Sequence, residues 1–295
     1  MNWKNVLIVG AVVLLPASIM AQANILNAKK PQDVGIRTDA QKAVDNDAPL
    51  AYGYVDDRDI LWSKTLWETI DLDERVNFPL YYPTDTIDIG SDRRSLYHVL
   101  MKNIKNGNLE AYADSYFTEK RNFGDLTAAL SKTDTLDFGY EQMNAGETVS
   151  EEFIARRDIT AAEIEEYRIK GIWYFDKRQG ELKYRLLGIA PVAPDVNFID
   201  DENPDKVELF WVWYPDAREV LHESKVFNQR NSAQPISFDM LLNARRFNAV
   251  IYKEDNVHGD RRVSDYIADN ALFQLLEAKR IKEVIRDREQ DMWAY

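Results

Sequence analysis

Apolar and polar side chains alternate along two neighbouring stretches in the middle of the chain, which is the pattern of half-buried β-strands. These stretches are residues 167–175 and 181–189, and the short loop between them ends at Gly180, which readily takes the positive φ of a hairpin loop. A third run, 207–214, ends before a proline, which cannot donate to a strand ladder. We therefore expect a central antiparallel sheet over about residues 167–214.

Helical periodicity is clearest after Ser91, which is a suitable N-cap residue. This helix is expected to end before Gly107, and its apolar stripe consists of Leu96, Val99, Leu100 and Ile104. Shorter helices are predicted at 123–130, 215–222 and 238–246.

A long helix is predicted from Val263 nearly to the C-terminus, because apolar residues recur at offsets of three and four. Its first half is expected to bury a clear face, whereas residues 279–291 are dense in charge and suit a surface or another subunit. A further strand at 249–253 is able to join the sheet. The expected fold class is α+β: a central antiparallel sheet packed with several helices, with a long C-terminal helix.

Three stretches are harder to assign. Residues 59–70 carry apolar side chains at near-helical offsets and predict a helix, with a strand as the alternative because several residues are β-branched. Residues 78–83 contain two prolines, so we expect an extended aromatic segment there. Residues 134–150 have loop composition. We expect residues 51–295 to form a single α+β domain, within which the stretch 131–150 is the strongest candidate for a boundary.

The N-terminus has the pattern of a cleaved signal peptide over residues 1–23. Lys4 precedes an apolar run that is too short to span a membrane, and an A-x-A motif follows, with cleavage after Ala21 or Ala23. Residues 24–50 are polar and without periodicity, which predicts a flexible N-terminal arm. The mature protein is therefore expected to be exported, with no direct membrane span.

The charge balance bears on the class of partner. The 295 residues include 50 acidic and 37 basic side chains, a net charge of -13, which disfavours nucleic acid because phosphates would be repelled. The chain contains no cysteine, so it can form no disulfide, carry no lipidated cysteine and use no thiol nucleophile.

No catalytic or metal-binding motif stands out in the sequence. The three histidines are far apart and lack the spacing of a helical metal pair, and no phosphate-binding glycine loop or G-x-S-x-G motif occurs. Two alternatives remain open. The first is an exported glycan or peptidoglycan hydrolase using carboxylates such as Asp71, Asp73 or Glu74, and the second is a calcium-dependent adhesive module using the acidic loop 195–205.

Several short motifs resemble one known family, the GldN/PorN family. The resemblance covers about residues 52–293, and motifs that carry it begin at Leu61, Asn77, Gly171, Leu187 and Asn243. They read Leu61-Trp-Ser-Lys64, Asn77-Phe-Pro-Leu-Tyr-Tyr-Pro83, Gly171-Ile-Trp-Tyr-Phe-Asp-Lys-Arg178, Leu187-Gly-Ile-Ala-Pro191 and Asn243-Ala-Arg-Arg246.

The resemblance implies a periplasmic component of the type IX secretion system of Bacteroidota, which also supports gliding motility in some members. It implies assembly into a ring with a GldK/PorK-type lipoprotein at the inner face of the outer membrane. It also implies contact with the periplasmic part of a GldM/PorM-type motor protein. It implies no catalytic residues, cofactor or metal.

A ring subunit that contacts its neighbours head to tail needs two different surfaces. We predict that these come from the aromatic residues of 61–83 and from the charged end of the C-terminal helix, 279–295. The candidate contact residues are Trp62, Trp67, Pro79, Tyr81, Tyr82, Arg286, Arg288 and Trp293.

Overall fold

The computed structural model describes residue 30 and residues 47–85, 87, 93–146, 148, 150–198, 204–228, 231, 235–268 and 270–293. The predicted signal peptide and nearly all of the predicted arm lie outside these residues, as does Ser91. Residue contacts divide the chain into two units, Met1–Ala48 and Pro49–Tyr295, and all the elements below belong to the second.

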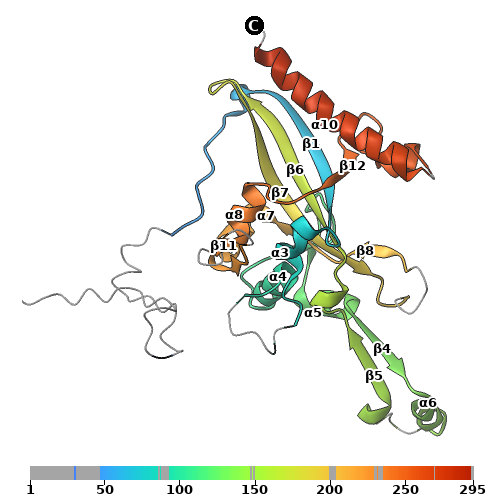
Figure 1. Ribbon diagram of the computed structural model, residues 1–295. Coiled ribbons are helices and arrows are strands. Elements are labelled where there is room, and N and C mark those ends of the chain that lie inside the picture. The colour runs from blue at the N-terminus through green and yellow to red at the C-terminus, as the bar shows by residue number, and fades with distance from the viewer. Residues whose placement is uncertain are drawn as a thin grey trace, which may run out of the picture. The chain divides into compact units, whose positions relative to one another are not determined.

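The second unit is built on an antiparallel sheet, which has eight strands among the described residues (Figure 1). The strand order is β12-β1-β6-β7-β9-β2-β3, and β8 pairs with β7. The strands are β1 Ile60–Asp71, β2 Ala111–Tyr112, β3 Lys120–Arg121, β6 Glu166–Asp176, β7 Glu181–Pro194, β8 Lys206–Glu208, β9 Trp211–Trp213 and β12 Val250–Glu254. The predicted hairpin is confirmed as β6 and β7, and β12 joins the sheet beside β1.

The helices differ in length and position. They are α3 Phe78–Tyr81, α4 Leu96–Lys105, α5 Phe123–Ala129, α6 Asp137–Asn144, α7 Tyr214–Glu223, α8 Phe238–Asn243, α9 Val263–Tyr266 and α10 Ala271–Trp293. Two small hairpins complete the unit: β4 Ser131–Thr135 with β5 Ile154–Asp158, and β10 Lys225–Val226 with β11 Ile236–Ser237. The α+β class predicted from the sequence is confirmed.

One face of the sheet carries two apolar clusters. Near the end of β1, Ile70 packs in the main core with residues of α3, α4, α7 and α8, such as Leu80 and Leu100. Nearer its start, Leu66 packs with Ile281 and Ile285 of α10, and Trp62, Trp173 and Leu182 lie against this second cluster. Helices α3, α4, α7 and α8 therefore cover this face of the sheet near the end of β1, and α10 covers it nearer the start of β1.

The expectation of a helix at 59–70 was wrong. Those residues form the long strand β1, which pairs with β6 along its whole length and with β12 over part of it. Leu66, Trp67 and Glu68 are buried in succession because both faces of the strand are covered at that point. A strand covered on both faces loses the two-residue alternation that would have identified it.

The aromatic segment 78–83 is only partly extended. Phe78 is helical (φ -50°, ψ -34°) and begins the short helix α3. Pro79 is tolerated in the first turn of this helix because a backbone N–H at that position would have no partner within the helix. Tyr82 is extended, as predicted.

Four other features also differ from expectation. Helix α4 begins after Ser95, whose hydroxyl accepts a hydrogen bond from the backbone N–H of His98. Part of the predicted loop 134–150 is the helix α6, and β7 continues through Pro191 to Pro194. The predicted C-terminal helix is divided into α9 and α10, because the chain leaves the helical region at Ile267 (φ -121°, ψ 77°).

Candidate interaction surfaces

The two tryptophans predicted as contact residues both lie against the sheet. Trp67 is 1% exposed and packs in a cluster with Ala190 and Trp211, so its side chain belongs to the interior. Trp62 is half-buried against the α10 cluster. Neither ring lies on an open surface of the protomer.

Two lysines flank Trp67 from the neighbouring strands. Lys170 of β6 and Lys253 of β12 are its cross-strand partners, and their ammonium groups lie 4.9 and 4.3 Å from a ring centroid of the indole. Burial lowers the pKa of each lysine, and their mutual repulsion lowers that of Lys170 further. Lys170 also donates to the Ser115 carbonyl at 2.9 Å, so this part of the sheet is covered.

The basic side chains of β7 are also engaged. Lys183 lies 3.7 Å from the buried Asp176 carboxylate, and Arg185 donates to the Gly53 carbonyl. Lys170, Lys183 and Arg185 therefore bind other parts of the chain and do not form an open basic face.

An aromatic groove runs beside α3, and it contains Pro79 and Tyr82 from the predicted contact residues. We define it by two adjoining cavities of about 480 and 420 Å³ that share Pro79 and Phe227. The first is lined by Arg75, Phe78, Pro79, Tyr82, Pro83, Arg93 and Phe227; the second is lined by Val76, Pro79, Phe227, Asn228, Ile236, Leu241, Arg245, Arg246 and Phe247.

Large apolar side chains are exposed along this groove. Tyr82 is 52% exposed, Val76 is 48% exposed and Phe227 is 45% exposed. Phe78 meets Tyr82 edge to face at 5.4 Å, which holds the two rings in a fixed geometry. Tyr81, by contrast, is tied to the protein body by a hydrogen bond from its hydroxyl to the Ala162 carbonyl.

A buried ion pair anchors the second part of the groove. Glu68 is 2% exposed, and both of its carboxylate oxygens lie 2.9 Å from a guanidinium nitrogen of Arg245. Burial opposes the charge of Arg245, but the Glu68 carboxylate outweighs this and raises the pKa of the guanidinium. The guanidinium also lies 4.2 Å from the ring centroid of Tyr184, and burial raises the pKa of that phenol.

The segment that carries Arg245 explains the Asn243-Ala-Arg-Arg246 motif. Arg245 has a positive φ of 48°, which is uncommon for a residue with a side chain and lets the chain turn after α8. Asn243 accepts from the Tyr52 hydroxyl, Arg245 reaches inward to Glu68, and the exposed Arg246 lines the groove.

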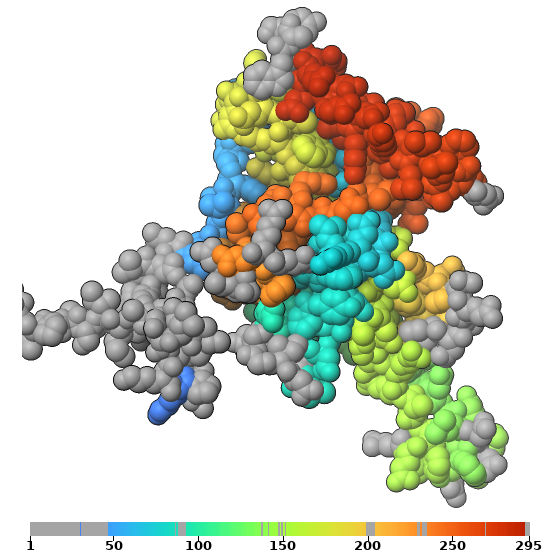
Figure 2. All heavy atoms as spheres, in the orientation of Figure 1, coloured from blue at the N-terminus to red at the C-terminus, as the bar shows by residue number. Residues whose placement is uncertain are grey.

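The second exposed apolar surface lies on α10. Side chains of this helix are exposed along its length (red in Figure 2). Ala278, Ile281 and Ile285 are buried against the sheet, whereas the first turns expose apolar side chains. These are Leu272 at 64%, Phe273 at 56%, Leu275 at 51% and Leu276 at 50%. The expectation that the first half of this helix buries a clear face was therefore wrong, because its apolar residues are divided between two faces.

The charged end of α10 is exposed as expected. Arg286 is 62% exposed at its side chain and pairs with Asp287, and Arg288 is also exposed. The side chain of Trp293 lies outside the described part of the protein.

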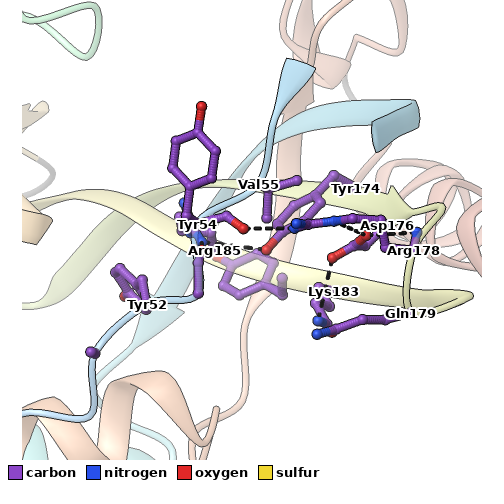
Figure 3. A pocket seen from close by; sticks show the side chains of 12 residues that line it. Tyr52, Tyr54, Val55, Tyr174, Asp176, Arg178, Gln179, Lys183 and Arg185 are labelled. Carbon is purple, nitrogen blue, oxygen red and sulfur yellow. Dashed lines mark hydrogen bonds and ion pairs between the residues drawn. The ribbon is translucent and has the colours of Figure 1, made fainter. Parts of the chain in front are cut away.

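Residues 50–55 form an extended segment, which we call the strap, that hydrogen bonds hold against the sheet (Figure 3). Three arginines donate to its backbone carbonyls: Arg218 to Leu50 at 2.6 Å, Arg185 to Gly53 at 3.1 Å and Arg178 to Tyr54 at 2.7 Å. No local sequence pattern predicts these contacts, because the three arginines come from separate parts of the chain.

Tyr52 is the anchor of the strap. Its ring lies 4.0 Å from the Arg218 guanidinium and 4.6 Å from that of Arg185, and burial raises the pKa of its hydroxyl. Beside it is a polar cavity of about 260 Å³ whose lining includes Tyr174, Asp176 and Lys183. With arginine and lysine on its walls, this cavity suits polar contacts rather than apolar docking.

Two of the three carboxylates considered for hydrolysis, those of Asp71 and Glu74, have structural partners. Asp71 accepts from the backbone N–H of Asp73, and Glu74 accepts from the Asn248 amide at 2.8 and 3.0 Å. Part of the acidic loop 195–205 lies outside the described residues, and within them no group of three or more His, Asp or Glu side chains is placed to hold a metal ion. None of the helices described here combines the length and apolarity needed to cross a bilayer.

Comparison with known families decides the identity of the chain. A family model described as gliding motility associated protein GldN matches residues 55–294, from the end of the strap to the end of α10. The chain belongs to the GldN family. No curated protein matches the chain. Membership of the GldN family supports a role in gliding motility and type IX secretion, as the resemblance implied.

Proposed function

We propose that this GldN-family protein is a non-catalytic structural subunit of the type IX secretion and gliding machinery. It acts in the periplasm after export by its signal peptide, and a GldK/PorK-type lipoprotein holds it at the inner face of the outer membrane. It associates with further copies of itself in a ring and contacts the periplasmic part of a GldM/PorM-type motor protein. The family match over residues 55–294 is the observation that carries this proposal.

The exposed surfaces of the described residues support an assembly role. The aromatic groove and the apolar face at the start of α10 are built from different elements and differ in chemistry. Two unlike patches on one protomer suit heterologous contacts, which generate rings when the rotation closes. Exposed apolar side chains grouped in this way mark interaction sites more often than isolated ones do.

Affinity purification of the mature protein from its own cell envelope in mild detergent, followed by mass spectrometry, tests the proposal. We expect the lipoprotein and the motor protein to accompany the wild-type chain in stoichiometric amounts. Recovery without either one, together with hydrolysis of purified peptidoglycan, would favour the hydrolase alternative.

A variant pair makes this test specific to a surface. Leu272→Ser with Leu276→Ser removes two exposed side chains of α10, and Leu50→Ser removes one on the strap that is 86% exposed. The α10 variant is expected to reduce recovery of at least one partner, whereas the strap variant is expected to retain both.

A further inference from the structure

A finger consisting of β4, α6 and β5, residues 131–158, stands apart from the large sheet. Among the described residues, β4 and β5 form a separate two-stranded sheet, and all five residues of β5 are exposed. The finger is anchored only at its base, where Ile159 donates its backbone N–H to the Leu130 carbonyl and both side chains lie in the main core. Figure 1 shows the finger projecting from the body of this unit, with α6 at its tip (green). A lone two-stranded hairpin is at best marginally stable in water, so the finger gains stability when another surface covers it.

The tip of the finger exposes large apolar side chains. Phe138 is 65% exposed, Met143 is 55% exposed, and Leu136 and Tyr140 are each 49% exposed. The rings of Phe138 and Phe153 lie 6.0 Å apart between centroids, which ties α6 to the residue before β5. Exposed apolar side chains grouped in this way mark interaction sites.

The charge around this tip has a single sign. Residues 133–153 contain no Lys, Arg or His and six acidic residues: Asp134, Asp137, Glu141, Glu147, Glu151 and Glu152. Asp134 pairs with Lys132 at 3.3 Å where this stretch begins, and Glu152 is exposed. The complement of the tip is therefore a surface that combines apolar area with basic side chains.

The same charge disfavours two other classes of partner. A second copy presents the same acidic tip and a net charge of -13, which makes it a poor recipient. A bilayer is also a poor recipient, because anionic lipids repel carboxylates and the helices that lie in a membrane interface carry Lys and Arg on their polar face.

We propose that the tip of the finger docks onto a basic surface with an apolar recess on a different protein. The apolar side chains of α6 enter the recess, and the carboxylates around them face the basic side chains at its rim. This contact goes beyond the proposed function, because it assigns a surface of this chain and the chemistry of the protein that covers it.

Photo-cross-linking of the full-length chain in its own cells tests the contact. The cross-linker p-benzoylphenylalanine in place of Tyr140 keeps an aromatic ring at the tip and leaves the contact between Phe138 and Phe153 intact. We expect a covalent product with another protein, joined through a peptide that contains more Lys and Arg than Asp and Glu. The same cross-linker in place of Tyr54, which is 79% exposed on the strap, is the control for exposure and should not give this product.

Substitutions in the chain with the cross-linker at residue 140 separate the apolar and the electrostatic contributions. Met143→Ser removes an apolar side chain one helical turn away, and Glu152→Lys reverses an exposed charge. Each is expected to lower the yield of product by about fivefold, as for a residue that matters to an interface. Glu219→Lys is the matched control, because this residue is exposed on α7, and it should leave the yield unchanged. Hydrogen exchange of α6 at the rate of the parent chain would show that the tip of each variant is folded.

The outcomes separate this inference from the proposed function. No product from residue 140, a product with a second copy or with lipid, or a product with a neutral or acidic peptide would each overturn the finger contact. If the lipoprotein and the motor protein still co-purify with the chain in that case, the assembly role stands. If the product with a basic peptide forms but no type IX component co-purifies, the finger contact stands and the proposed function is overturned.

Discussion

At the scale of single residues, the packing around the Glu68–Arg245 ion pair depends on the absence of a side chain at residue 171. Gly171 lies across from Leu66 on β1, and a Cβ atom at this glycine would overlap the phenol of Tyr184. Tyr184 in turn packs against the Arg245 guanidinium. The glycine therefore makes room for a ring that packs against both Arg245 and the main core.

Gly171→Ala is expected to destabilise the protein by about 1–3 kcal/mol, because Tyr184 or the strand must shift. The change in unfolding free energy is measured by urea denaturation. Gly124→Ala is the control, since nothing lies within 4 Å of a Cβ there and the residue is in α5. Equal effects of the two substitutions would contradict the assignment of a steric role to Gly171.

Glu68→Gln is expected to cost about 3 kcal/mol of stability, because it leaves the charge of Arg245 without its partner in a largely buried site. The matched control is Glu283→Gln, which breaks an exposed helical pair with Lys279 and should cost less than about 0.5 kcal/mol. Denaturation at pH 7 measures both. A loss below about 1 kcal/mol at Glu68 would mean that Arg245 finds another partner.

At the scale of elements, the periodicity of apolar residues was sufficient to predict a helix or strand where one of its faces is buried and the other is exposed. The β6–β7 hairpin and α4 were predicted on this basis. It failed for β1, which is covered on both faces, and for α10, where apolar side chains serve two faces. The sequence contains no local signal that separates the apolar face of a helix into an inner and an outer part.

The aromatic groove was only partly predictable for a similar reason. Pro79 and Tyr82 stood out as an aromatic and proline segment, but Phe227 and Arg246 are distant in sequence and reach the groove only through the fold. A pattern among neighbouring residues cannot show that residues distant in sequence come together in the fold. Of the residues that line the second cavity, Pro79 and the motif containing Arg245 and Arg246 were the available signals.

The two faces of α10 are expected to respond differently to truncation. Ile281→Ala should destabilise the protein by about 2–5 kcal/mol, because this side chain is 2% exposed against the sheet. Leu276→Ala, at a residue 50% exposed, should cost well under half as much. Thermal and urea unfolding of both variants test this. A larger loss at Leu276 would show that the outer face is covered within the protomer.

At the scale of the whole molecule, buried tyrosines set the response of the fold to alkaline pH. Tyr167 is 1% exposed, and burial raises the pKa of its phenol above the ordinary value near 10. The stability gained by burying the neutral ring is fully present below pH 10. It is lost as the pH rises from 10 towards the folded pKa, because only the unfolded chain then releases the proton.

The stability difference between the wild type and Tyr167→Phe should therefore be constant from pH 7 to about pH 10. Above pH 10 it should shift in favour of the variant by roughly 1.4 kcal/mol per pH unit. Urea denaturation of both proteins across this range measures the difference, and the values at pH 7 serve as the internal reference. A difference that stays constant to pH 11 would contradict the assignment.

The position of β1 has a mechanical consequence. This strand lies between β6 and β12, and its pairing with β6 extends between its two ends. A tensile load applied between those ends runs along the strand, whereas the ladder hydrogen bonds run across it. Such a load shears many bonds at once instead of opening them one after another, so β1 resists tension along its own length.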